Sequence, residues 1–172
     1  AAGLAGRAHL APDPNKAMHQ YVLDSWSTDT LPASDSVAIA QDADGYMWFG
    51  TQQGLLRFDG VRHRVFDRSK FFGLRSEAIN ALAVDSRGEL WAGTNDGVYR
   101  LQGQQAIAYD VPGRSEPTVV VALLEDRSGR IWVGTLEGLG QVIATPEPHL
   151  ALLPTLPKKW VGGMTEGPDG RI

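Results

Sequence analysis

One motif occurs three times in this chain, and its spacing constrains the fold more than any other feature. The copies are DADGYMWFGTQQGLLRF, DSRGELWAGTNDGVYRL and DRSGRIWVGTLEGLGQV, which begin at Asp42, Asp85 and Asp126. They recur at intervals of about 42 residues, a period that indicates a repeat architecture. A fourth copy begins at Glu166 as EGPDGRI. We therefore expect the 172-residue sequence to be cut inside a repeat.

Each repeat contains four short strand-forming segments bounded by turn residues. In the middle copy these segments are 79–84, 90–93, 98–101 and 106–109. They are too short for amphipathic helices and lack sustained i, i+3, i+4 apolar spacing. The 20 glycines and 10 prolines favour many tight turns. The pattern predicts an all-β fold of β-propeller blades, each of four antiparallel strands, with about three complete blades and the start of a fourth.

The expected organisation is a tail at residues 1–17 followed by a partial propeller at 18–172. The repeats lie near 21–60, 62–103 and 105–143, with an incomplete one at 149–172, and a strand is expected at 160–164. The composition of the tail resembles what remains after signal-peptide cleavage. The segment 21–26 is expected to be the outer strand that closes a ring. An incomplete ring leaves apolar blade faces and strand edges exposed, which predicts self-association, most simply as a dimer.

Three residue types recur at fixed places in the repeats and are expected to be structural. The aspartate should accept hydrogen bonds from amides two or three residues further on, and the glycine should take the positive φ that closes the turn. The tryptophan on the second strand should wedge between adjacent blades. These positions are Asp42, Gly45, Trp48, Asp85, Gly88, Trp91, Asp126, Gly129 and Trp132.

Composition and residue spacing exclude several classes of function. The net charge is −4 and no basic cluster is present, which argues against a nucleic-acid partner and gives no support for membrane contact. The chain has no cysteine, and no two of its four histidines have metal-ligand spacing, so neither a metal nor a cofactor is expected. The carboxylates of the motif recur at a turn in every copy, which favours a turn role over acid-base chemistry.

Candidate ligand-binding residues lie in the loops that enter the innermost strands and in those that join the second and third strands. Guanidinium, hydroxyl and amide groups converging there would suit a sugar or an acidic oligosaccharide, although ordinary solvated loop residues are the alternative. The candidates are Arg75, Ser76, Glu77, Arg114, Ser115, Lys158, Gln52 and Asn95. The same loops carry Asp35, Ser36, Glu116, Glu137 and Lys159, and Tyr46, Phe71 and Phe72 could stack on sugar rings.

The repeated motif D-x-x-G-x-[YLI]-W-x-G-T-x-x-G-[LV] resembles the two-component regulator propeller repeat over roughly residues 21–142. The third copy departs from it at Gly140-Gln141, and the proline-rich segment 146–163 departs further. The resemblance implies a non-enzymatic, ligand-binding sensor region. Such regions lie in the periplasm and are tethered to the inner membrane in hybrid histidine kinases and in diguanylate cyclases. Two alternatives are a propeller enzyme, such as a lyase or glycosidase, and a protein-interaction scaffold.

Overall fold

The computed structural model describes residues 37–67, 69–154 and 159–172, and every regular element in these ranges is a strand. The expected tail at 1–17 and the ring-closing segment at 21–26 lie outside them. The strands form three sheets, in the orders β1-β2-β3-β4, β5-β6-β7-β8 and β12-β11-β10-β9. Their bounds are β1 (Ala38–Gln41), β2 (Met47–Thr51), β3 (Gly54–Phe58), β4 (His63–Phe66), β5 (Ile79–Val84), β6 (Leu90–Thr94), β7 (Gly97–Gln102), β8 (Gln105–Tyr109), β9 (Val120–Glu125), β10 (Ile131–Thr135), β11 (Gly138–Ile143) and β12 (His149–Leu152).

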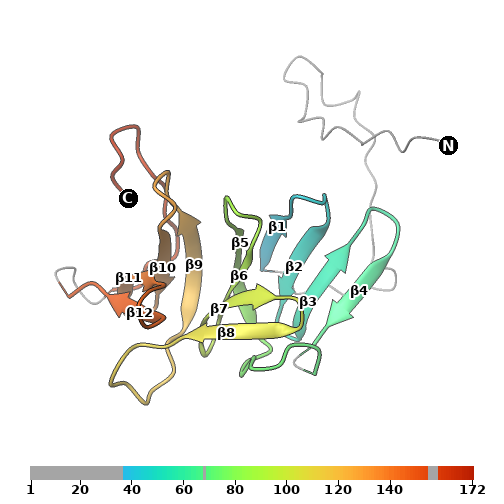
Figure 1. The fold of residues 1–172 in the computed structure, drawn as a ribbon, viewed down its shortest axis with the longest axis horizontal. Coiled ribbons are helices and arrows are strands. Elements are labelled where there is room, and N and C mark those ends of the chain that lie inside the picture. Colours follow the sequence, from blue (N-terminus) through green and yellow to red (C-terminus); the bar gives the residue numbers. More distant parts are fainter. Residues whose placement is uncertain (1–36, 68, 155–158) are drawn as a thin grey trace.

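The three sheets are consecutive blades of a β-propeller, here called blades 1, 2 and 3. All strand pairs within them are antiparallel. In each blade the strands lie side by side in sequence order, from the first, innermost strand to the fourth, outermost one. Figure 1 shows the blades side by side, with the innermost strands β1, β5 and β9 next to one another. The predicted all-β propeller fold is therefore confirmed, and the four strands expected in the middle repeat agree with β5–β8 to within two residues at each end.

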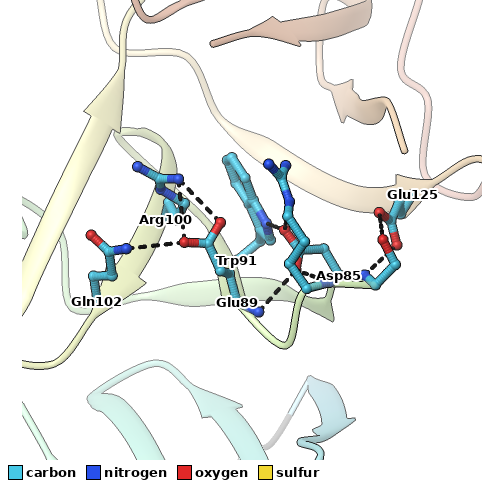
Figure 2. Close-up of polar contacts among 8 residues, drawn as sticks. Asp85, Glu89, Trp91, Arg100, Gln102 and Glu125 are labelled. Carbon is cyan, nitrogen blue, oxygen red and sulfur yellow. Dashed lines mark hydrogen bonds and ion pairs between the residues drawn. The ribbon is translucent and has the colours of Figure 1, made fainter. Parts of the chain in front are cut away.

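The repeated aspartate joins the first turn of each blade to the tryptophan on the second strand. In blade 2, Asp85 Oδ1 accepts hydrogen bonds from the backbone N–H of Arg87 at 3.0 Å and of Glu89 at 2.8 Å. Its Oδ2 accepts the indole N–H of Trp91 at 3.0 Å, as Figure 2 shows. The amides are thus two and four residues further on, and not two or three as expected, because the turn glycine N–H bonds to the aspartate carbonyl instead.

The same carboxylate-to-indole hydrogen bond is present in the other two blades. Asp42 Oδ2 lies 2.7 Å from Trp48 Nε1, and Asp126 Oδ2 lies 2.8 Å from Trp132 Nε1. The glycines that close these turns have the predicted positive φ, and the values are 88° for Gly45, 81° for Gly88 and 77° for Gly129.

Trp48 and Trp91 pack between adjacent blades. Trp48 of blade 1 belongs to a buried cluster that contains Leu90 and Leu101 of blade 2. Trp91 of blade 2 is 2% exposed and packs with Ile131 of blade 3. Because each indole N–H is satisfied by its own aspartate, these large rings can be buried without leaving a polar group unpaired.

A glycine near the end of each second strand allows the next blade to approach closely. A Cβ added at Gly93 of blade 2 would lie 2.4 Å from Val120 Cγ1 of blade 3, and one added at Gly50 of blade 1 would lie 2.8 Å from Ile79 Cγ2 of blade 2. The innermost strand of each following blade therefore packs directly on this glycine.

The described residues after blade 3 begin a fourth copy without forming a strand. Gly170 has a φ of 77°, like the turn glycines before it. Val161 donates one backbone hydrogen bond to the carbonyl of Thr135 at 3.0 Å. The strand expected at 160–164 is wrong for this structure, because no ladder of hydrogen bonds pairs the segment with another described residue. None of the described segments forms a helix with the length and apolarity needed to cross a bilayer.

Candidate functional site

The candidate loops gather at one end of blades 2 and 3, here called the loop face. It consists of the segments that enter β5 and β9 and the turns that follow β6 and β10. A cavity of about 130 Å³ opens there, lined by Arg75, by residues of blade 2 and by the segment that leads into blade 3. Its lining includes three residues predicted from the sequence, Arg75, Arg114 and Ser115, together with Glu116. The structure thus brings Arg75 of the first Arg-Ser-Glu segment and all three residues of the second to one cavity.

Arg75 is held in place by groups from three segments. Its Nε donates to the Tyr99 hydroxyl at 2.8 Å and lies 3.1 Å from Asp96 Oδ2. Its Nη1 donates to Asp110 Oδ2 at 3.3 Å, and its Nη2 contacts the other oxygen of the same carboxylate. The hydrogen bond to Asp110 is the main reason that the pKa of Arg75 lies above its usual value. Burial raises the pKa of Tyr99.

Arg114 forms the equivalent ion pair in blade 3. Its Nη1 donates to Glu137 Oε2 at 2.8 Å, and its Nη2 donates to Oε1 of the same carboxylate. This bidentate hydrogen bonding to Glu137 raises the pKa of Arg114. Glu137 occupies the place in blade 3 that Asp96 occupies in blade 2, just before the glycine that opens the third strand. The loop face therefore repeats an arginine–carboxylate pair.

The remaining predicted residues are placed differently. Asn95 accepts a hydrogen bond from Asn80 Nδ2 at 2.9 Å, and Asn80 also donates to the carbonyl of Val120 at 3.1 Å. Ser76 is half-buried and Glu77 exposed, outside the cavity lining. Gln52 is exposed in the turn after β2, on blade 1. Lys158, Asp35 and Ser36 lie outside the described residues, and Lys159 is exposed.

The aromatic candidates differ in how far their rings are exposed. Phe71 is 3% exposed within the core between blades 1 and 2, so it is not available to stack on a sugar, whereas Phe72 is 84% exposed. Tyr46 is half-buried beneath the guanidinium of Arg57, whose Cζ lies 4.3 Å from its ring centroid. The stacking suggested for Phe71 is therefore wrong, because apolar packing of the loop after β4 places its ring inside the protein.

Sequence reasoning missed Asp96 and Asp110, the carboxylates that pair with Arg75. Asp96 and Asp110 lie 21 and 35 residues from Arg75, a separation at which no local pattern predicts contact. A signal was nevertheless present in the sequence. Each of the two repeats with an Arg-Ser-Glu segment also has an acidic residue immediately before the glycine that opens its third strand, Asp96 in blade 2 and Glu137 in blade 3.

The loop face offers hydrogen-bonding chemistry to a polar ligand. The Arg75 and Asp110 side chains are 46% and 58% exposed, so water or a ligand can reach both groups of the pair. Ser115 and Glu116 add an exposed hydroxyl and carboxylate. In the described part of the chain no three His, Asp or Glu side chains gather as a metal site would require. His63 and His149 lie on the outermost strands β4 and β12.

Solved structures of several propellers are similar to this chain. The extracellular domain assigned to the hybrid two component system BT3049 from B. thetaiotaomicron has a TM-score of 0.69 and 23% identity over 86% of this chain and 22% of that one. The domain assigned to BT4673 of the same organism has a TM-score of 0.60 and 23% identity over 69% and 17%. Virginiamycin B lyase from Staphylococcus aureus has a TM-score of 0.54 and 17% identity over 73% and 44%.

These comparisons differ in what they establish. Because all three structures are less than 25% identical to this chain, the likeness shows the shared propeller fold. The chain spans only about a fifth of the two B. thetaiotaomicron chains. No curated protein matches the sequence. The family model described as "Two component regulator propeller" matches residues 30–53, 73–96 and 115–137. The chain therefore contains three repeats of the two component regulator propeller type.

Proposed function

We propose that this chain is part of the extracytoplasmic, ligand-binding sensor region of a bacterial transmembrane signalling protein. The output would be of the two-component or cyclic-di-GMP type, and the region itself would not be enzymatic. The family repeats and the similarity to extracellular domains of hybrid two component systems support this proposal. A periplasmic location, tethered to the inner membrane by regions beyond this sequence, follows from the same proposal.

The cavity on the loop face carries the proposal. Its paired arginines and its exposed hydroxyl and carboxylate groups suit an oligosaccharide, in particular an acidic one whose carboxylate would compete for Arg114. Arg114 lies in the segment that leads from blade 2 into blade 3. A ligand that replaces Glu137 at this guanidinium would favour one arrangement of that segment over another, which is the thermodynamic requirement for a signal.

Titration of the chain with trigalacturonate tests this proposal, with maltotriose as the uncharged control. We expect isothermal titration calorimetry to detect binding of the acidic sugar, and we expect Arg114→Gln to weaken it by at least about tenfold because a charge-assisted hydrogen bond is lost. Glu77→Gln is the matched control, since Glu77 is exposed on the same face but outside the cavity lining. Equal affinity of the Arg114→Gln variant would contradict the assignment of the site.

We also propose that the chain self-associates through the exposed inner edge of blade 1. Val37 and Ile39 at this edge are 57% and 59% exposed. Light scattering coupled to size exclusion should give the mass of a dimer, and Ile39→Lys should shift the equilibrium toward the monomer. A monomer at concentrations above about 100 µM would contradict a specific dimer, since weak protein contacts are populated in that range.

A further inference from the structure

The junction between blades 1 and 2 contains a groove that is lined by none of the polar ligand-binding candidates. It has a volume of about 250 Å³. Apolar side chains of both blades and the guanidinium of Arg57 line it. The lining consists of Asp42, Trp48, Arg57, Phe66, Phe71, Gly88, Leu90, Leu101 and Gly103. Gly88 and Gly103 belong to the first and third turns of blade 2, whereas the loop face carries its second turn, so the groove opens toward the opposite end of the blade.

Arg57 has an unusual environment for a charged side chain. It lies opposite Trp48 in the register of β2 and β3. Its Cζ lies 4.3 Å from the ring centroid of Tyr46, 5.6 Å from that of Phe66 and 5.7 Å from that of Trp48. Within the described residues no carboxylate lies within ion-pair distance of its guanidinium. Aromatic faces hold the cation in place, but its N–H groups are left for another acceptor.

In blade 2 the arginine at the equivalent position has a carboxylate partner. Arg100 lies opposite Trp91, as Arg57 lies opposite Trp48. Its Nη1 donates to both oxygens of Glu89, at 3.1 and 3.3 Å, and Gln102 donates to the same carboxylate at 3.0 Å, as Figure 2 shows. In blade 1 the place of Glu89, two residues before the tryptophan, is taken by Tyr46. The intramolecular anion of blade 2 is therefore replaced by a ring in blade 1.

The junction also lacks the carboxylate clamp that joins blades 2 and 3. There, Glu125 of β9 accepts hydrogen bonds from the backbone N–H and the hydroxyl of Ser86, each at 2.7 Å (Figure 2). At the junction of blades 1 and 2, the corresponding residues are Val84 and Ala43. Neither side chain can form this clamp. The edge of the groove beside the Asp42 turn is consequently not closed by a polar bridge.

We infer that this groove binds a small carboxylate carried on a ring. The ligand carboxylate would accept hydrogen bonds from the Arg57 guanidinium, as the Glu89 carboxylate does from Arg100 in blade 2. Its ring would pack on Phe66 of blade 1 and on Leu90 and Leu101 of blade 2. Aromatic acids and uronic acids share this chemistry, and the site is separate from the loop face.

The indole N–H of Trp48 provides a local readout, since it lies in the groove and bonds to Asp42. In NMR spectra of the ¹⁵N-labelled chain, titration with benzoate or glucuronate should shift the resonance of the Trp48 indole N–H. The Trp48→Phe variant lacks this resonance and so assigns it. A ligand of this size should bind in about the millimolar range. Benzamide and glucose, which lack the charge, should bind at least about tenfold more weakly. A response to benzoate or to glucuronate alone would identify the ligand as an aromatic or a uronic acid.

Three variants test the role of the guanidinium. Arg57→Gln should weaken binding at least about tenfold. Tyr46→Glu should do the same, because it supplies the intramolecular carboxylate found in blade 2. Arg100→Gln removes the equivalent arginine of blade 2 and should leave the affinity unchanged.

The inference is overturned if neither acid moves the Trp48 signal, or if binding survives Tyr46→Glu undiminished. Tyr46→Glu retains Arg57, so it decides the question even if Arg57→Gln does not fold. Binding of trigalacturonate at the loop face is measured separately and can fail without affecting this result.

Discussion

Replacement of Asp126 by asparagine should destabilise the protein through the loss of two of four hydrogen bonds. The carboxylate of Asp126 is fully buried. Its Oδ1 accepts the backbone N–H groups of Ser128 and Arg130, at 2.9 and 3.0 Å, and its Oδ2 accepts Trp132 Nε1 at 2.8 Å and Arg130 Nε at 2.6 Å. Asparagine can keep the first pair, but its NH₂ group would face two donors. We expect a loss of about 2–4 kcal/mol in the free energy of unfolding at pH 7.

The same carboxylate should make the protein less stable in acid. Burial alone would raise the pKa of Asp126, but the hydrogen bonds from Trp132 and Arg130 outweigh it and lower the pKa from 3.8 to about 2. The unfolded chain therefore binds a proton more readily than the folded protein does. The stabilisation is complete above about pH 4 and disappears as the pH falls toward about 2, and the shift corresponds to roughly 2 kcal/mol.

Urea unfolding followed by far-ultraviolet circular dichroism measures both effects. At pH 7 the Asp126→Asn variant should unfold at a lower urea concentration than the unmodified chain, and the gap between the two should narrow between pH 4 and about pH 2.5. Asp169→Asn is the control, because the Asp169 side chain is 58% exposed and its partner Arg171 is 88% exposed, so its effect should stay within about 0.5 kcal/mol. A gap that does not change with pH would refute the assigned role of the Asp126 charge.

Two further predictions concern the contacts between blades 2 and 3. Gly93→Ala should lower the free energy of unfolding by about 1–3 kcal/mol, because its Cβ would lie 2.4 Å from Val120 Cγ1. Gly163→Ala meets nothing within 4 Å and should change little; equal urea midpoints for the two would contradict the packing argument. Glu125→Gln should speed amide hydrogen exchange at Ser86 several-fold, since the amide loses a charged acceptor. Unchanged exchange would exclude the clamp.

The repeated positions made most of the fold predictable from sequence. A turn glycine such as Gly88 and a strand tryptophan such as Trp91 recur in register three times, so the limits of each strand are determined by comparison of the copies as well as by local propensity. The hydrogen bond between Asp85 and Trp91 was not predicted, although both residues are present in every copy. A turn aspartate and a buried tryptophan each have a sufficient local explanation, and only the geometry of the first hairpin shows that they meet.

The candidate site was predictable only in part, because its contacts depend on how neighbouring blades pack. The sequence placed Arg75 and Arg114 in equivalent loops, and the structure brings both to one cavity. It did not reveal that Asp110, at the start of the segment leading to blade 3, pairs with Arg75. That contact spans 35 residues and depends on the positions of two loops, for which the repeat pattern contains no information.

Arg57 has no carboxylate partner among the described residues, and this difference is detectable only when equivalent positions of the blades are compared. Two residues before the tryptophan, blade 1 has Tyr46, blade 2 has Glu89 and blade 3 has Arg130, which pairs with Asp126 of its own turn. Each of these three residues is compatible with the aspartate–indole hydrogen bond and with the glycine packing, because those interactions are formed by residues at other positions of the repeat. The variable position can therefore change the chemistry at a blade junction while the repeated residues preserve the fold. In blade 1 it leaves a cation facing a groove, and this physical difference is the basis for expecting an anionic ligand there.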